Sequence, residues 1–195
     1  MSLFSLMAQR HSLSLVENRG QWPQQVVAAS DVEGGKVFLE QSAITYHLFD
    51  LGGMSADHDI DLSQPRIRGH VYRVQFLGAN NAPTPALFEK KKNRHTNFFL
   101  GSDSEHWAGG CSHYGEATLT SLYPGINLKL NSEGPFLKYD FIVAPKSDAG
   151  QIRMQYEGHS KLSLENGRLV VGTSIGDVTE QKPIAWQIID GVKQF

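Results

Sequence analysis

The chain of 195 residues has 18 Lys and Arg against 20 Asp and Glu, and its formal net charge of −2 offers no basic field for a phosphate backbone, so we expect no nucleic-acid partner. Its single cysteine, Cys111, excludes an intrachain disulfide framework and a thiolate-rich zinc site. No apolar run reaches the roughly 18 residues of a membrane-spanning helix, so we do not expect the chain to span a membrane.

The start of the chain and one later stretch predict its division into parts. Residues 1–14 are expected to be a leader or the remnant of an export signal followed by a flexible start, because the apolar segment from Phe4 to Ala8 ends in a small residue. We then expect an N-terminal β lobe at residues 15–80 and a C-terminal β lobe at residues 86–195. The boundary is placed at Gly78 to Pro85, a stretch with two prolines, although one continuous domain fits the same pattern.

In the first lobe, large apolar side chains alternate with polar ones. From Ile44 to Leu48 every second side chain is large and apolar, and Val37 to Leu39 precede this run across a short polar stretch. The two segments are therefore predicted to form a hairpin. The run from Tyr72 to Phe76 has the same alternation and predicts a further strand.

Turn residues divide the second lobe into hairpins. Ser132 to Pro135 separates two alternating runs, Ile126 to Leu130 and Leu137 to Val143. Asn166-Gly167, the dipeptide favoured in two-residue hairpin turns, separates the next two runs. Further predicted strands are Ile152 to Tyr156, Ile184 to Ile188 and a segment that starts at Val192 after the Asp190-Gly191 turn signal.

Many short strands joined by regularly spaced turns, without sustained helical spacing, predict an all-β fold. We expect this fold to be β-sandwich-like, as one extended sandwich or as two packed β lobes. Only Asp103 to Gly109 and Pro145 to Ile152 are expected to hold a short helical turn, each after a capping Asp or Ser.

One string resembles the nucleophile elbow of hydrolases. Gly172 to Gly176 matches G-x-S-x-G around Ser174. That motif requires a strand that leads into a helix, and a histidine later in the chain, whereas the last histidine here is His159. We therefore interpret the two glycines as turn or bulge positions and expect no catalytic residues.

A second string offers three zinc ligands, His106, Cys111 and His113, at a spacing that matches no standard zinc finger. The preferred interpretation is a surface loop with two solvated histidines and a buried thiol. The basic run from Lys90 to Lys92 is interpreted as a solvated loop or sheet edge, because no wider basic surface accompanies it.

Three alternating carboxylates, Asp57, Asp59 and Asp61, resemble the start of a calcium loop. The sixth-position glycine and twelfth-position glutamate of an EF-hand are missing, so a solvated acidic loop is the alternative. The three aspartates are the candidate metal ligands, but we expect no cofactor.

Aromatic side chains in loop-like segments are candidates for carbohydrate binding, because flat rings present apolar faces to sugars. These are Trp22, Trp107 and Tyr114. The alternative is that their rings pack within the protein.

Several blocks, in order along nearly the whole chain from about Leu15, are similar to those of a known family. The blocks are Val16 to Trp22, Asn97 to Asp103 with Trp107, Leu122 to Leu128, Leu137 to Pro145 and Gly176 to Gln187. With these blocks the chain resembles the N-terminal domain of large exported proteins of Bacteroidetes that carry SBBP-type β-propeller repeats or PKD and Ig-like modules. Many such proteins end in a gliding-motility-associated sorting domain that type IX secretion recognises.

The resemblance implies a cellular location and neighbouring modules, and it implies no enzymatic reaction. We expect a non-catalytic structural or adhesion-associated module of a secreted or cell-surface protein, linked to gliding motility or to type IX secretion. The alternative is a carbohydrate-binding module, with or without help from calcium. The implied partners are other modules of the same polypeptide, an extracellular polysaccharide or a surface protein.

Overall fold

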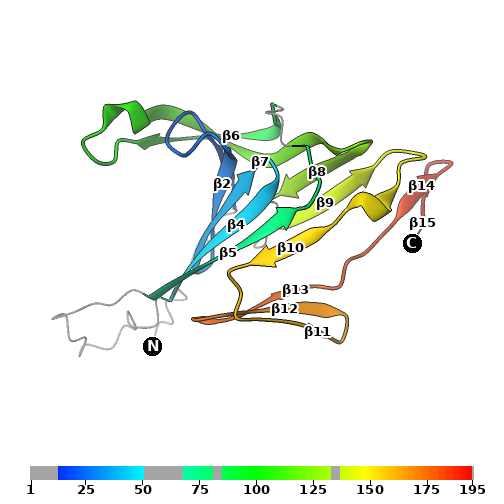
Figure 1. Ribbon diagram of the computed structural model, residues 1–195. Coiled ribbons are helices and arrows are strands. Elements are labelled where there is room, and N and C mark those ends of the chain that lie inside the picture. Colours follow the sequence, from blue (N-terminus) through cyan, green and yellow to red (C-terminus); the bar gives the residue numbers. More distant parts are fainter. Residues whose placement is uncertain (1–12, 51–67, 81–84, 133–136, 195) are drawn as a thin grey trace, which may run out of the picture.

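The computed structural model describes residues 13–50, 68–80, 85–132 and 137–194. In these ranges the protein is all-β, as predicted, with two short 3-10 helices (Figure 1). The elements are β1 Leu15–Glu17, β2 Val26–Val32, β3 Gly35–Glu40, β4 Ala43–Asp50, β5 Arg68–Phe76, β6 Leu87–Phe98, η1 Ser104–His106, β7 Ala108–Tyr123, β8 Ile126–Asn131, β9 Lys138–Val143, η2 Ala149–Gln151, β10 Met154–Glu157, β11 Lys161–Glu165, β12 Arg168–Thr173, β13 Gly176–Glu180, β14 Gln187–Ile189 and β15 Val192–Gln194.

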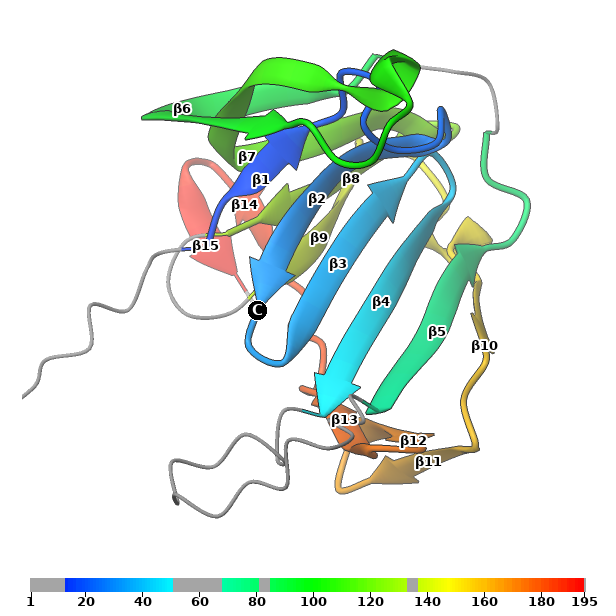
Figure 2. The same cartoon turned by 90° about the vertical axis from the view of Figure 1, so that its left-hand side faces the viewer.

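Ten strands form one antiparallel sheet in the order β10-β5-β4-β3-β2-β1-β7-β8-β9, with β6 paired to β7 beside this path. The sheet curls strongly, so that β2 and β3 lie in front of β8 and β9 in Figure 2. The curl encloses a sandwich-like core. Its two terminal strands, β9 and β10, are not paired with each other.

The core follows from the period-two alternation of the strands. In β8 the side chains of Ile126, Leu128 and Leu130 are buried, whereas the polar side chains between them are only half-buried. The opposite wall contributes Val37, Ile44 and others from β3 and β4 to the same cluster. The alternation thus turns one face of β3, β4 and β8 toward the inside of the curl.

A separate three-stranded sheet, β11-β12-β13, lies beyond one end of the curl (Figures 1 and 2). Val171 of β12 is fully buried and packs with Tyr72 and Val74 of β5. The third sheet consists only of the hairpin β14-β15, in which every described residue is exposed.

The hairpins predicted from local turn signals are confirmed. β3 pairs with β4, β8 with β9, β11 with β12, and β14 with β15. The Asn166-Gly167 turn has φ angles of 52° and 78°, the pair of positive values that a type I′ turn requires. The two predicted helical turns are η1 and η2, capped by Asp103 and Asp148.

Two long strands were not predicted. β6 contains the lysines 90–92 and is an edge strand that pairs with β7. Cys111, His113 and Tyr114, all expected in loops, lie in β7 instead. The residues of β7 do not show the alternation of apolar and polar side chains expected of a strand. Glycines interrupt the pattern, and polar residues such as Glu116 are buried along the strand.

Strand pairing crosses the predicted boundary between the two lobes, as the alternative of one continuous domain requires. β1 pairs with β7, and β5 pairs with β10, so strands from both sides of residues 81–84 share one sheet. Ser14, assigned to the leader, is buried. Among the described residues, no helix has the length and apolar character needed to cross a membrane.

Candidate functional site

The three aromatic residues predicted to bind carbohydrate differ in their exposure and in their ring partners. Trp22 is half-buried, and its ring meets Phe38 and Phe98 edge-on at 5.8 and 5.2 Å. Tyr114 packs against Phe88 farther along β7. Trp107, which is 44% exposed, lies at the tip between β6 and β7.

Of the possible metal ligands, only His106, Cys111 and His113 lie in the described part of the chain. Asp57, Asp59 and Asp61 lie outside the described residues. His106 is exposed and bonds to Asp103, whereas Cys111 is fully buried in β7. Within the described ranges no group of three His, Cys, Asp or Glu side chains is placed to hold a metal ion.

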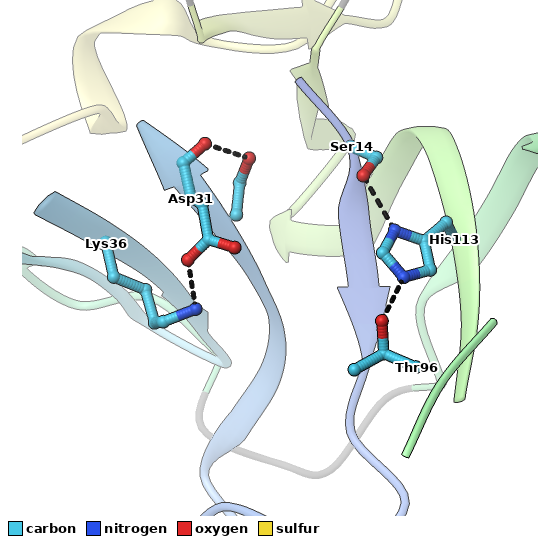
Figure 3. Close-up of polar contacts among 6 residues, drawn as sticks. Ser14, Asp31, Lys36, Thr96 and His113 are labelled. Atoms are coloured by element: carbon cyan, nitrogen blue, oxygen red, sulfur yellow. Dashed lines mark hydrogen bonds and ion pairs between the residues drawn. The ribbon is translucent and has the colours of Figure 1, made fainter. Parts of the chain in front are cut away.

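His113 is a buried structural histidine and not a solvated one. Its Nδ1 lies 2.7 Å from the Ser14 hydroxyl and its Nε2 lies 2.8 Å from the Thr96 hydroxyl (Figure 3). A neutral imidazole has one donor and one acceptor, which two hydroxyl groups can satisfy. Burial, followed by the positive charges of Arg94 and Lys92, lowers the pKa of His113. The contact joins the segment before β1 to β6 and β7.

Ser174 lies in the β12–β13 turn, as the interpretation of its glycines predicted. His70 of β5 is its partner, because Nδ1 accepts a hydrogen bond from the Ser174 backbone N–H at 3.2 Å and lies 3.0 Å from its hydroxyl oxygen. The other ring nitrogen of His70 is buried and has no partner among the described residues. A catalytic histidine needs an orienting group at that position. The contact ties the turn to the large sheet.

The most concentrated polar cluster is formed by Glu180 and four tyrosines. The Tyr139 hydroxyl of β9 donates to one Glu180 carboxylate oxygen at 2.8 Å, and the Tyr156 hydroxyl of β10 donates to the other at 3.0 Å. Tyr46 and Tyr72 stack beside them with their ring centroids 4.5 Å apart. Glu180 thus connects the small sheet to both terminal strands of the large one.

The negative charge of this carboxylate helps to raise the pKa values of the four tyrosines. Burial, followed by the negative charge of Glu180, raises the pKa of Tyr72, Tyr139 and Tyr156. The pKa of Tyr46 is raised by burial, then by Tyr72 and Glu180. Tyr72 is 1% exposed, and its hydroxyl has no partner among the described residues. The cluster is therefore a partly unsatisfied polar group at the edge of an apolar core.

A cavity of about 210 Å³ adjoins the cluster. It lies between β3 and β4 on one side and β8, β9 and β13 on the other, and its walls include Val37, Ile44, Leu130, Val178 and the tyrosines 46 and 139. The exposed residue Glu33 also lines it, so the cavity reaches the surface there.

Sequence reasoning assigned no role to Glu180. The usable signal was the tyrosines, which occupy the large-side-chain positions of four predicted strands. A buried tyrosine hydroxyl usually finds a hydrogen-bond partner, so four such residues together predict a buried acceptor. Which carboxylate provides it depends on contacts between distant strands.

No curated protein matches the chain, and no solved structure matches it. A family model described as a domain of unknown function, DUF7948, matches residues 15–195. The match covers nearly the whole chain. The chain therefore belongs to the DUF7948 family of domains of unknown function.

Proposed function

We propose that the chain is a non-catalytic structural, adhesion-associated module of a large exported cell-surface protein, and that its β14–β15 hairpin docks on a neighbouring module of that protein. The observation that carries this proposal is the exposure of apolar side chains on, and directly before, a hairpin that forms a sheet of its own. Trp186, which directly precedes β14, is 53% exposed, and Ile188 of β14 is 65% exposed. Large exposed apolar side chains that cluster in this way mark protein–protein contacts.

The hairpin has the geometry of a strand-addition site. A two-stranded hairpin alone is marginally stable in water. Ile188 and Ile189 point to opposite faces because side chains alternate along a strand, and both are exposed. Pairing with the sheet edge of a second β module would supply main-chain hydrogen bonds and would cover both faces. A β-rich neighbour is therefore the partner that this hairpin fits.

The resemblance of the ordered sequence blocks to N-terminal domains of exported Bacteroidetes proteins supports the location. It also supports the link to gliding motility and type IX secretion. Neither expectation depends on a particular residue of the chain, so the location is best tested directly.

Brief trypsin treatment of intact source cells tests the location. The segment from Leu169 to Lys193 follows Arg168 and serves as the reporter peptide, because trypsin does not cleave the bond between Lys182 and Pro183. We expect mass spectrometry to find it in the released fraction while peptides of an abundant cytosolic enzyme are absent. Finding the reporter peptide only after cell lysis would refute a surface location.

A carbohydrate-binding role is the second candidate, and the exposed tip between β6 and β7 favours it. Phe99 and Trp107 meet there at 5.8 Å, and Leu100 beside them is exposed. A glycan-array screen with and without calcium tests this role. Binding that is lost in Trp107→Ala and retained in Tyr114→Ala would support it, and uniformly negative arrays would contradict it.

A further inference from the structure

We propose that the cavity beside Glu180 binds a small organic cation, a primary ammonium group carried on a short apolar body. This site is independent of the docking role proposed above. Three properties of the described residues lead to it: the volume of the cavity, its apolar walls and an anionic group beside it that has no basic partner.

The volume and walls define the apolar part of the ligand. An apolar cavity of about 150 Å³ in a protein holds one benzene molecule. The cavity here measures about 210 Å³, which leaves room for a ring and a short substituent. Val37, Ile44, Leu130 and Val178 provide an apolar lining for such a ring. Burial of its surface would supply the favourable free energy.

The Glu180 carboxylate lies behind the cavity wall, one hydrogen bond away from the lining residue Tyr139. Tyr139 both lines the cavity and donates its hydroxyl hydrogen bond to Glu180 at 2.8 Å. Val178 also lines the cavity, and it lies two residues before Glu180 on β13, so both side chains point to the same face of that strand. Only the side chain of Tyr139 is therefore known to stand between the carboxylate and a molecule bound in the cavity.

The charge of Glu180 is not neutralised by the protein. Its two hydrogen-bond donors are the neutral phenols of Tyr139 and Tyr156, and no Lys, Arg or His among the described residues forms an ion pair with it. A carboxylate has about four lone-pair sites, so two remain for another donor. The lining residues include one acidic side chain, Glu33, and no basic one.

The tyrosine rings suit a cation as well. Tyr46 and Tyr139 line the cavity, and aromatic faces attract ammonium groups. The field of Glu180 reaches Tyr46, whose pKa it helps to raise. A neutral molecule of the same size would fill the cavity without using either feature, so the comparison of a cationic probe with its neutral counterpart is decisive.

Benzylamine and benzyl alcohol are the matched probes, because they share the ring and differ mainly in the charge of the substituent at neutral pH. Each is titrated into the whole chain while backbone amide NMR signals of residues around Val178 and Tyr46 are followed. We expect saturable shifts with benzylamine and at least about tenfold weaker binding of benzyl alcohol, the ratio that one charge-assisted contact produces.

Two variants separate the role of Glu180 from general effects. Glu180→Gln keeps the side-chain shape and should reduce the tenfold preference to less than about twofold. Glu157→Gln makes the same change on an exposed residue of β10 and should leave the preference unchanged. The comparison of the two probes on the unmodified chain needs no variant, so it decides the question even if Glu180→Gln does not fold.

Three results would overturn the proposal. They are an absence of saturable shifts near the cavity, equal affinities for the two probes on the unmodified chain, and an undiminished preference for benzylamine in a folded Glu180→Gln protein.

Discussion

Tyr156 of β10 donates a hydrogen bond to Glu180 of β13, with 3.0 Å between their oxygen atoms. Tyr139 of β9 makes the equivalent contact at 2.8 Å. Because β9 and β10 are the two ends of the curled sheet, one carboxylate links strands that no main-chain ladder joins. Glu180 thus joins the two unpaired terminal strands of the sheet through side-chain hydrogen bonds, a contact that we call the latch.

Replacing Tyr156 by Phe should weaken this latch. The substitution removes one hydrogen bond to a charged group, and such bonds contribute about 1.5–3 kcal/mol. Since Tyr156 is only half-buried, we expect the free energy of unfolding to fall by about 1.5 kcal/mol in urea denaturation. Tyr114→Phe is the control, because that hydroxyl has no hydrogen bond within the described residues, and its effect should stay within about 0.5 kcal/mol. Equal losses in the two variants would argue against the latch.

Alkaline pH should destabilise the protein through the same cluster. The pKa of Tyr46, Tyr72, Tyr139 and Tyr156 is raised in the folded state above the ordinary value near 10. Their contribution to stability is therefore complete below about pH 10 and is lost as the pH rises toward the folded-state values. We expect tyrosinate absorbance to appear together with loss of the β-sheet circular dichroism signal.

Glu180→Gln provides the matched measurement for the alkaline transition. Without the carboxylate charge, the tyrosine pKa values should be raised less, so stability should decline less between neutral pH and the alkaline range. Tyrosine ionisation that precedes unfolding by a wide margin would show that the cluster does not control the transition.

Short-range signals explain which parts of the fold could be predicted. Asn166-Gly167 and Asp190-Gly191 specify their turns through the left-handed conformation of both residues, and the paired strands follow within a few positions. The alternation at Ile126, Leu128 and Leu130 reflects a strand with one buried face. All of this information lies within one hairpin.

Long-range burial explains the failures. β7 is covered on both faces along much of its length, and Ser112, His113 and Glu116 are buried there, so its polar residues mimic a loop. Glu116 is compatible with burial because Lys129 lies 2.5 Å away on the neighbouring strand β8. The Glu180 cluster likewise combines residues from β4, β5, β9, β10 and β13, a coincidence that no local pattern contains.

Mild acid should destabilise the protein through His113. Burial and the charges of Arg94 and Lys92 lower its folded-state pKa below the ordinary value near 6.5, although Asp31 opposes the shift. Below about pH 6.5 the unfolded chain takes up a proton that the folded chain resists, so stability declines as the pH falls toward the folded-state pKa. We expect the free energy of unfolding to decrease from pH 7 to about pH 5.

The slope of stability against pH, and not its absolute value, is the informative quantity. His113→Gln should flatten that slope even if it lowers stability at pH 7, because the titrating group is gone. His106→Gln changes an exposed histidine and should leave the slope of stability against pH unchanged, because His113 is still present. A slope that is unchanged in His113→Gln would assign the acid sensitivity to another group.

The turn between β7 and β8 offers a test of close packing. Gly125 has a φ angle of 71°, and a Cβ atom added there would lie 2.0 Å from the Ser147 hydroxyl oxygen. Gly101 has nearly the same φ angle, 73°, but apart from its chain neighbours no described residue has an atom within 4 Å of such a Cβ. Gly101→Ala should therefore cost only the left-handed strain, about 1 kcal/mol, whereas Gly125→Ala should cost more because Ser147 must also move.

Combining Gly125→Ala with Ser147→Gly isolates the steric part of this cost. Removal of the serine side chain leaves only the strain of the positive φ angle, so the loss caused by Gly125→Ala should fall to that of Gly101→Ala. Thermal or urea unfolding of the four proteins in the cycle gives the coupling energy, which for residues in contact is about 0.5–3 kcal/mol. A coupling near zero would mean that the segment around Ser147 adapts without cost, and the close approach at Gly125 would then not explain the glycine.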